Sequence, residues 1–178
     1  MVTESFGPDH ELAEAKVVAA ADARRRLRRE VEVTASEATF RGVLCATVEA
    51  GVPVAVATHD GRLRGIPIEV GVDCVRIETL AGQQVVVRLD SVVAVEPSGT
   101  GPDLASDRAH PSSLHLADVV AGYVGTRVAV SLACAGGRTF EGLVTTCGLD
   151  VATLRTGGGP SSYVALDSVN EVWSPSIP

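Results

Sequence analysis

One short pattern occurs twice in the chain. The block Leu89–Asp–Ser–Val92 recurs as Leu166–Asp–Ser–Val169, and Asp73 recurs as Asp150, each at an offset of 77 residues. Self-similarity of this size indicates that one small structural unit has been repeated. A chain of this kind must therefore fold as two related modules, and its function depends on what two copies can do together.

The offset between the copies changes once. Val54–Ala–Val56 matches Val128–Ala–Val130 at an offset of 74, whereas Gly65 matches Gly142 at an offset of 77. We therefore expect one insertion of three residues, placed in the longer second-copy turn Leu132–Gly137. A turn between two strands accommodates added residues at little entropic cost.

Each copy shows the pattern of five short strands. Apolar, β-branched runs alternate with polar residues and are separated by glycine-bearing turns, which is typical of antiparallel sheets. The strands expected in the first copy cover residues 52–57, 63–70, 74–80, 85–89 and 91–95. Because closing such a sheet removes its exposed edges, the sequence predicts a mainly β protein with two tandem, small, five-stranded SH3-like antiparallel barrels.

Helices are expected in three places. An Ala-, Glu- and Arg-rich segment, residues 9–33, lacks Gly and Pro and predicts an N-terminal α-helix. A capping box at Thr34–Ala–Ser–Glu37 predicts a short helix that ends near Gly51, and a second short helix is expected from Pro111 to Gly125. The predicted domains are a helical extension (1–35), barrel 1 (36–97), a Gly- and Pro-containing linker (98–113) and barrel 2 (114–178).

Composition limits the classes of function. The chain has 178 residues, 46% of them hydrophobic but only 3% aromatic, so its cores must consist of aliphatic side chains. No run is long enough to span a membrane, no secretory signal opens the chain, and four cysteines without CxxC spacing predict reduced thiols in a cytoplasmic protein. Abundant Ala, Val, Gly and Arg suggest a GC-rich bacterial genome.

No catalytic motif is present in the sequence. The four histidines have no partner at metal-ligand or nucleophile spacing, and Gly157–Gly–Gly–Pro160 joins two expected strands without the helix and lysine of a phosphate loop. We therefore expect a protein that is not an enzyme, with no metal, no cofactor and no identifiable small-molecule substrate.

A basic cluster interrupts an otherwise acidic chain. The formal net charge of −7 argues mildly against non-specific nucleic-acid binding, yet Arg24–Arg29 holds five arginines in six positions. Two interpretations remain open. The cluster is either a solvated face of the N-terminal helix, or a phosphate-contacting patch that includes Arg24, Arg25 and Arg28.

The repeated unit resembles the Sm/LSm superfamily, whose bacterial member is the Hfq-type RNA chaperone. The resemblance rests on a helix followed by five strands, on Gly71–Val–Asp73 before the third strand, and on the junction Val85–Pro97 between the fourth and fifth strands. It covers roughly residues 36–97 and 112–174. It implies that units assemble edge to edge, fourth strand against fifth strand, as a homo-oligomer such as a ring of three chains, with RNA bases bound between units.

The resemblance also implies candidate RNA-binding residues. Asp73 and Arg88 match family positions that line the base pocket, and Arg76 lies near a position where the family reads a base. The sequence departs from the family at Leu89, which replaces a glycine, and the second copy has Ala165 in place of the arginine. Asp73 also has a simpler interpretation, since Gly–Val–Asp is common turn chemistry.

Three functions remain open. The first is RNA binding through barrel 1 and the arginine helix. The alternative is a protein-interaction or scaffolding module without nucleic-acid binding, in which barrels pair through strand edges. A DNA-binding regulator is a third possibility, although no helix-turn-helix pattern accompanies the arginine helix.

Overall fold

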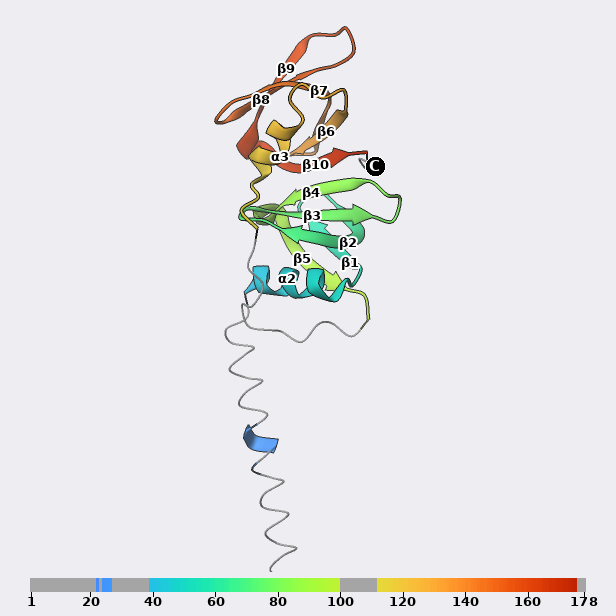
Figure 1. Ribbon diagram of the computed structural model, residues 1–178, viewed down its shortest axis with the longest axis vertical. Coiled ribbons are helices and arrows are strands. Elements are labelled where there is room, and N and C mark those ends of the chain that lie inside the picture. The colour runs from blue at the N-terminus through green and yellow to red at the C-terminus, as the bar shows by residue number, and fades with distance from the viewer. Residues whose placement is uncertain (1–21, 23, 27–38, 100–111, 176–178) are drawn as a thin grey trace, which may run out of the picture. The chain divides into compact units, whose positions relative to one another are not determined.

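The computed structural model describes residues 22, 24–26, 39–99 and 112–175 (Figure 1). The chain divides into two compact units, Met1–Ala38 and Thr39–Pro178. In the first unit, residues 22 and 24–26 are helical and exposed, which agrees with the predicted N-terminal helix at these positions. The remainder of the predicted helix 9–33 lies outside the described residues.

The second unit contains both repeats, each with one α-helix, five strands and one short 3-10 helix. The first repeat consists of α2 (Phe40–Ala50), β1 (Val54–Thr58), β2 (Arg62–Val70), β3 (Cys74–Thr79), β4 (Gln84–Arg88), η1 (Leu89–Ser91) and β5 (Val92–Pro97). The second repeat consists of α3 (Leu116–Gly122), β6 (Ala129–Cys134), β7 (Arg138–Cys147), β8 (Val151–Arg155), β9 (Ser161–Ala165), η2 (Leu166–Ser168) and β10 (Val169–Ser174).

The ten strands of the described residues all belong to one antiparallel sheet. Their order is β5-β1-β2-β3-β4-β10-β6-β7-β8-β9, so the sheet passes from the first repeat to the second where β4 pairs with β10 (Figure 1). The prediction of a mainly β fold is confirmed. The sheet is not closed, because β5 and β9 are its two edges, and the prediction of two separate five-stranded barrels is not confirmed. None of the described helices is long and apolar enough to cross a membrane.

The recurring Leu–Asp–Ser–Val block forms the same joint in both repeats. The Leu89 amide donates to the Asp73 carbonyl oxygen at 2.9 Å, and the Leu166 amide donates to the Asp150 carbonyl oxygen at 2.8 Å. The serine hydroxyl of each block donates at 2.7 Å to the backbone carbonyl three residues earlier. The block therefore recurs because it closes a 3-10 turn between two strands of the sheet.

The predicted three-residue insertion in the second hairpin is wrong. Val54 pairs with Gly65, and the residue that pairs with the corresponding Gly142 is Val130, 76 positions after Val54. The helices α2 and α3 also begin 76 residues apart, so the second hairpin is longer by one residue. Matching Val54 to Val128 misses this, because a shift of two residues keeps the same side chains on the same face of a strand.

The helices begin later than the sequence patterns predict. The N-cap of α2 is Thr39, whose hydroxyl accepts a hydrogen bond from the Gly42 amide at 3.0 Å, and the helix ends at Gly51 as predicted, with a φ of 61°. The predicted capping box, residues 34–37, lies outside the described residues. Helix α3 begins at Leu116 rather than Pro111.

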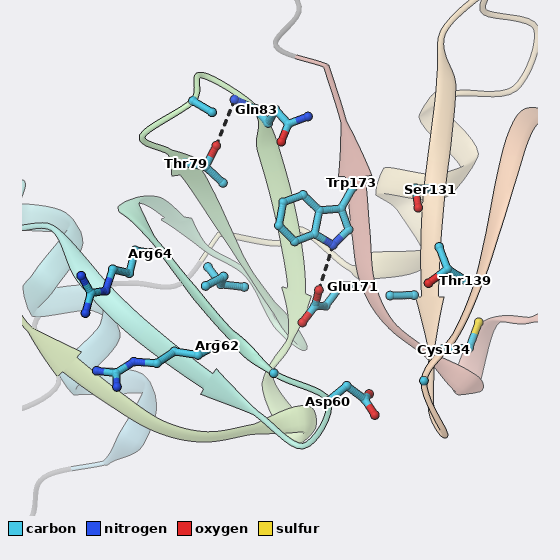
Figure 2. Close-up of a pocket in the computed structure, with 15 residues that line it drawn as sticks. Asp60, Arg62, Arg64, Thr79, Gln83, Ser131, Cys134, Thr139, Glu171 and Trp173 are labelled. Atoms are coloured by element: carbon cyan, nitrogen blue, oxygen red, sulfur yellow. Dashed lines mark hydrogen bonds between the residues drawn. The ribbon is translucent and has the colours of Figure 1, made fainter.

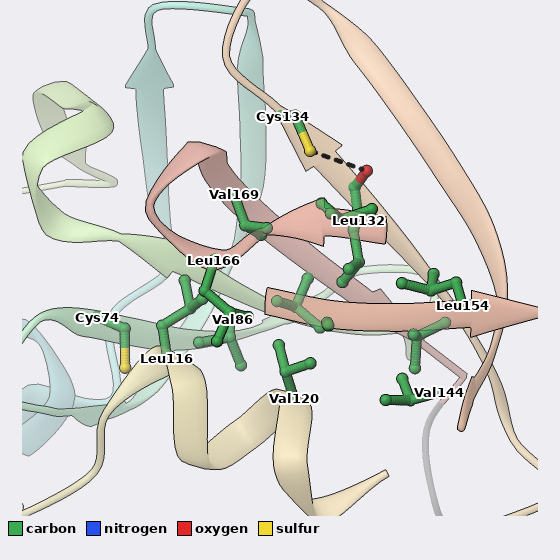
Figure 3. Close-up of a cluster of buried hydrophobic side chains, with 14 residues drawn as sticks. Cys74, Val86, Leu116, Val120, Leu132, Cys134, Val144, Leu154, Leu166 and Val169 are labelled. Carbon is green, nitrogen blue, oxygen red and sulfur yellow. Dashed lines mark hydrogen bonds between the residues drawn. The ribbon is translucent and has the colours of Figure 1, made fainter. Parts of the chain in front are cut away.

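Each repeat has its own hydrophobic core, and β4 contributes to both. Val85 and Val87, both 0% exposed, belong to the core of the first repeat. Val86 is 4% exposed and lies with Cys74 in the core of the second repeat (Figure 3). Strand β4 is therefore buried on both faces, which explains why its sequence is a continuous run of valines.

We predict that Gly65→Ala destabilises the protein. A Cβ at Gly65 would overlap the backbone oxygen of Glu78 and the side chain of Ile77 on β3, so the two strands would have to separate. The expected loss in the free energy of unfolding is about 1–3 kcal/mol, measured by urea denaturation. Gly61→Ala is the matched control, since nothing lies within 4 Å of a Cβ there. Equal stability of both variants would contradict the prediction.

Candidate functional site: the junction between the repeats

The junction between the repeats is an antiparallel ladder of β4 with β10. Val87, Val86 and Val85 lie opposite Glu171, Val172 and Trp173, respectively. Val86 and Val172 are 4% and 1% exposed. The ladder therefore joins the repeats through both backbone hydrogen bonds and apolar burial.

Arg88 forms hydrogen bonds with the second repeat at one end of this ladder. Its Nε donates to the carbonyl oxygen of Val169 at 2.8 Å, and its Nη2 donates to the carbonyl oxygen of Leu166 at 2.6 Å. Both carbonyls belong to the joint between β9 and β10 of the second repeat. Hydrogen bonds from a charged donor are the stronger kind, so Arg88 ties the first repeat to the second.

Asp73 completes the same contact. Its carboxylate lies 3.9 Å from Nη1 of Arg88 and accepts a hydrogen bond from the Leu116 amide at 2.9 Å. The His115 ring also lies 3.8 Å from this carboxylate. A carboxylate at the first turn of a helix satisfies a free amide and complements the helix dipole. Asp73 therefore holds the start of α3 against the first repeat.

The chain just before α3 follows the turn between β2 and β3. The Val72 amide donates to the carbonyl oxygen of Leu114 at 2.8 Å, and the Ser112 amide donates to that of Val70 at 2.9 Å. A Cβ at Gly71 would overlap the Leu114 carbonyl oxygen. Glycine at position 71 thus allows the two backbones to approach closely.

The structure brings together two of the six residues that the sequence singled out. Asp73 and Arg88 contact each other, whereas Arg76 forms a separate ion pair with Glu69 on β2, at 3.4 Å. In the N-terminal unit, Arg24 is exposed and Arg25 lies 3.9 Å from Asp22, also at the surface. Arg28 lies outside the described residues.

The buried thiol beside this site is inert. Cys74 is 0% exposed, and its Sγ lies 3.9 Å from the Leu114 carbonyl oxygen. Burial, and then the negative charge of Asp73, raise the pKa of the Cys74 thiol to about 12. Burial likewise raises the pKa of Cys134 and Cys147. These thiols stay protonated at neutral pH and are poor nucleophiles.

A groove of about 590 Å³ separates the two repeats on one side of the junction (Figure 2). Trp173 and Glu171 of β10 lie between the β1–β2 hairpin of the first repeat and β6–β7 of the second. The side chains of Arg62 and Arg64 extend away from the indole (Figure 2). Both arginines nevertheless line the groove, so it combines an aromatic ring, carboxylates and two arginines.

Two carboxylates of the groove, Glu171 and Asp60, accept hydrogen bonds from neighbouring side chains. The Trp173 indole donates to Oε2 of Glu171 at 2.8 Å, and the Thr58 hydroxyl donates to Oε1 of the same carboxylate at 3.2 Å. Asn170 donates to Asp60 at 2.7 Å. The bonds from Thr58 to Glu171 and from Asn170 to Asp60 link the hairpin of the first repeat to β10 and add to the junction.

Sequence reasoning missed Trp173. The signal was available, because the only tryptophan of the chain stands where the first repeat has Glu96, 77 residues earlier. Glu96 forms an ion pair with Arg62, whereas Trp173 packs against the core of the first repeat. This difference between the copies marks the internal junction.

Neither the family models nor the curated proteins contain a match to this chain. Among the described residues, no group of three or more His, Cys, Asp and Glu side chains could hold a metal ion. What the junction can do chemically is to hold two repeats together through charge-assisted hydrogen bonds and apolar burial.

Replacing Arg88 by alanine is expected to weaken the junction. The substitution removes the charged donor to two carbonyls, so we expect a loss of about 1.5–3 kcal/mol in the free energy of unfolding, measured in urea. Arg64→Ala is the control, because Arg64 is exposed and no described residue gives it a hydrogen bond or ion pair. A loss below about 0.5 kcal/mol for Arg88→Ala, the range of ordinary surface changes, would refute this role.

Proposed function

We propose that the protein is a non-catalytic scaffold that assembles edge to edge with further copies of itself. One observation carries the proposal: within the chain, the fourth strand of the first repeat pairs with the fifth strand of the second, β4 with β10. The corresponding strands β9 and β5 are the open edges of the sheet. The same pairing can therefore form between β9 of one copy and β5 of another.

The strand order within each repeat supports the resemblance to the Sm/LSm superfamily. Each repeat places a helix before five strands, and the first repeat runs in the order β5-β1-β2-β3-β4. On this basis we propose that each repeat is an Sm-like, SH3-like barrel unit and that the assembly acts in the cytoplasm. Head-to-tail contacts of this type produce either rings or open filaments, and a ring of three chains is the assembly we expect.

Exposure at the open edges supports pairing between copies. Tyr163 on β9 corresponds to Val86 on β4. Val86 is 4% exposed because the second repeat covers it, whereas Tyr163 is 76% exposed. Val95 on β5 corresponds to Val172, the partner of Val86. In a contact between copies, Tyr163 of one would face Val95 of the other.

The contact between copies would be weaker than the internal junction. Ala165 stands at the position of Arg88, so no guanidinium is available for the carbonyls of Leu89 and Val92. An assembly whose internal joints are strong and whose outer joints are weaker can form and dissociate reversibly as whole chains.

Substitutions at the two edges test the proposal. Tyr163→Glu and Val95→Lys should each weaken self-association at least tenfold, because each places an unpaired charge in the contact. The double variant should recover association, since the two charges then face each other. Sedimentation velocity and light scattering measure this against the 18.3 kDa chain. Leu80→Glu is the control, because Leu80 is 80% exposed and lies on neither edge strand. A wild-type chain that stays monomeric at all concentrations would rule out the proposal.

RNA binding is a second candidate, favoured by the exposed arginines Arg24, Arg25 and Arg26. Asp73 and Arg88 are engaged in the junction, so binding would depend on this cluster. Gel shifts with short U-rich and A-rich RNA test it. Changing all three arginines to glutamine should reduce the magnitude of the negative slope of log affinity against log salt concentration by about 2. A wild-type dissociation constant weaker than about 10⁻⁴ M at low salt would exclude this function.

A further inference from the structure

The start of α3 is buried in the internal junction. Leu116, the first residue of this helix, is 0% exposed and packs with Cys74 and Val86 of the first repeat (Figure 3). Its amide donates to the carboxylate of Asp73. Helix α3 therefore packs both on β7 of its own repeat and on β4 of the other.

The start of α2 has no such cover. Phe40, the first residue of α2, corresponds to Leu116 and is 43% exposed. The first amides of a helix have no partner inside it, and Thr39 satisfies only that of Gly42. The face that α3 uses to join two repeats is thus present on α2 but lacks an occupant among the described residues.

The matching turn of the second repeat is also bare. Leu149 and Asp150 correspond to Val72 and Asp73, and Leu149 is 103% exposed whereas Val72 is 38% exposed. Asp150 is exposed, and no amide of the described residues donates to its carboxylate as Leu116 donates to Asp73. The second repeat therefore has a turn like Gly71–Asp73, but no helix start among the described residues docks on it.

Gly148 gives an independent indication. Its φ is not positive, and a Cβ there would come no closer than 3.5 Å to any other atom, which is an ordinary contact. At the corresponding Gly71, a Cβ would overlap the backbone of Leu114. Among the described residues nothing requires glycine at position 148, but a backbone that docked on this turn, as residue 114 docks on the first, would require it.

We propose that the start of α2 in one copy docks on the turn Gly148–Asp150 of a second copy. Asp150 then accepts the Phe40 amide, as Asp73 accepts that of Leu116. Phe40 packs against Val151 and Tyr163, which correspond to Cys74 and Val86. This inference rests on the proposed edge-to-edge assembly and adds a second contact beside the β9–β5 ladder.

The identity of the exposed aromatics supports a second copy as the partner. The chain has three Phe and two Tyr, and both Phe40 and Tyr163 stand at positions whose counterparts are buried in the internal junction. Aromatic side chains supply much of the energy of protein interfaces, and a Phe–Tyr pair adds to simple burial. The two exposed rings would meet only across two copies.

The test measures self-association of the full chain by sedimentation. Phe40→Ala should raise the dissociation constant of self-association about tenfold or more, as expected for an aromatic residue at the centre of an interface. Asp150→Ala should raise the dissociation constant about twofold to thirtyfold, the range for loss of a helix cap. Val124→Ala is the control, because Val124 is 41% exposed, close to the value for Phe40.

A mixing experiment separates a lost contact from a misfolded chain. Phe40→Asp retains an intact turn and Asp150→Ala retains an intact α2, so their mixture contains one complete contact and should associate more tightly than either variant alone. If both variants associate as tightly as wild type while Tyr163→Glu does not associate, the docking is overturned and the edge pairing stands. If wild type never associates, both proposals fail.

Discussion

The pairing of β4 with β10 is the interaction on which the rest of the structure depends. It places β4 between two cores, with Val85 and Val87 in one and Val86 in the other. Burying adjacent valines on opposite faces requires cover on both faces: the first repeat covers Val85 and Val87, and the second repeat covers Val86. The ladder therefore joins two similar modules into one compact unit, Thr39–Pro178.

Polar contacts specify how the two repeats meet. Arg88 donates to two carbonyls of the second repeat, and Asp73 caps the helix that begins it. The resemblance to Sm-like proteins implies that these two positions contact RNA. In this structure they instead connect the first repeat to the second. These contacts favour one register of the ladder, because a slip would separate the partly buried Arg88 from both carbonyls and from Asp73.

The two repeats differ where their neighbours differ. Ala165 and Glu96 replace the arginine and the tryptophan of the internal junction, while Phe40, Leu149 and Tyr163 leave apolar surface exposed. If the second repeat contacted only the first, the fold would not need the turn Gly148–Asp150 to match Gly71–Asp73. This match is consistent with a chain that joins to others as its repeats join to each other.

The sequence alone determined the repeat, the mainly β class, the approximate strand positions and the glycine-bearing turns. These depend on local backbone preferences and on the alternation of apolar residues, which can be read over a few positions. It also singled out Asp73 and Arg88, which do lie together, although only a resemblance linked them.

Only the tertiary structure decided which strands pair and which distant side chains contact each other. The offset of 76 before the hairpin, the open sheet, the β4–β10 ladder and the role of Trp173 all depend on which distant segments pair. Alternation defines the faces of a strand but allows shifts of two residues, and an edge strand carries no local signal for its neighbour. Those choices are made by hydrogen bonds and burial between residues some 80 positions apart, such as Arg88 and Leu166.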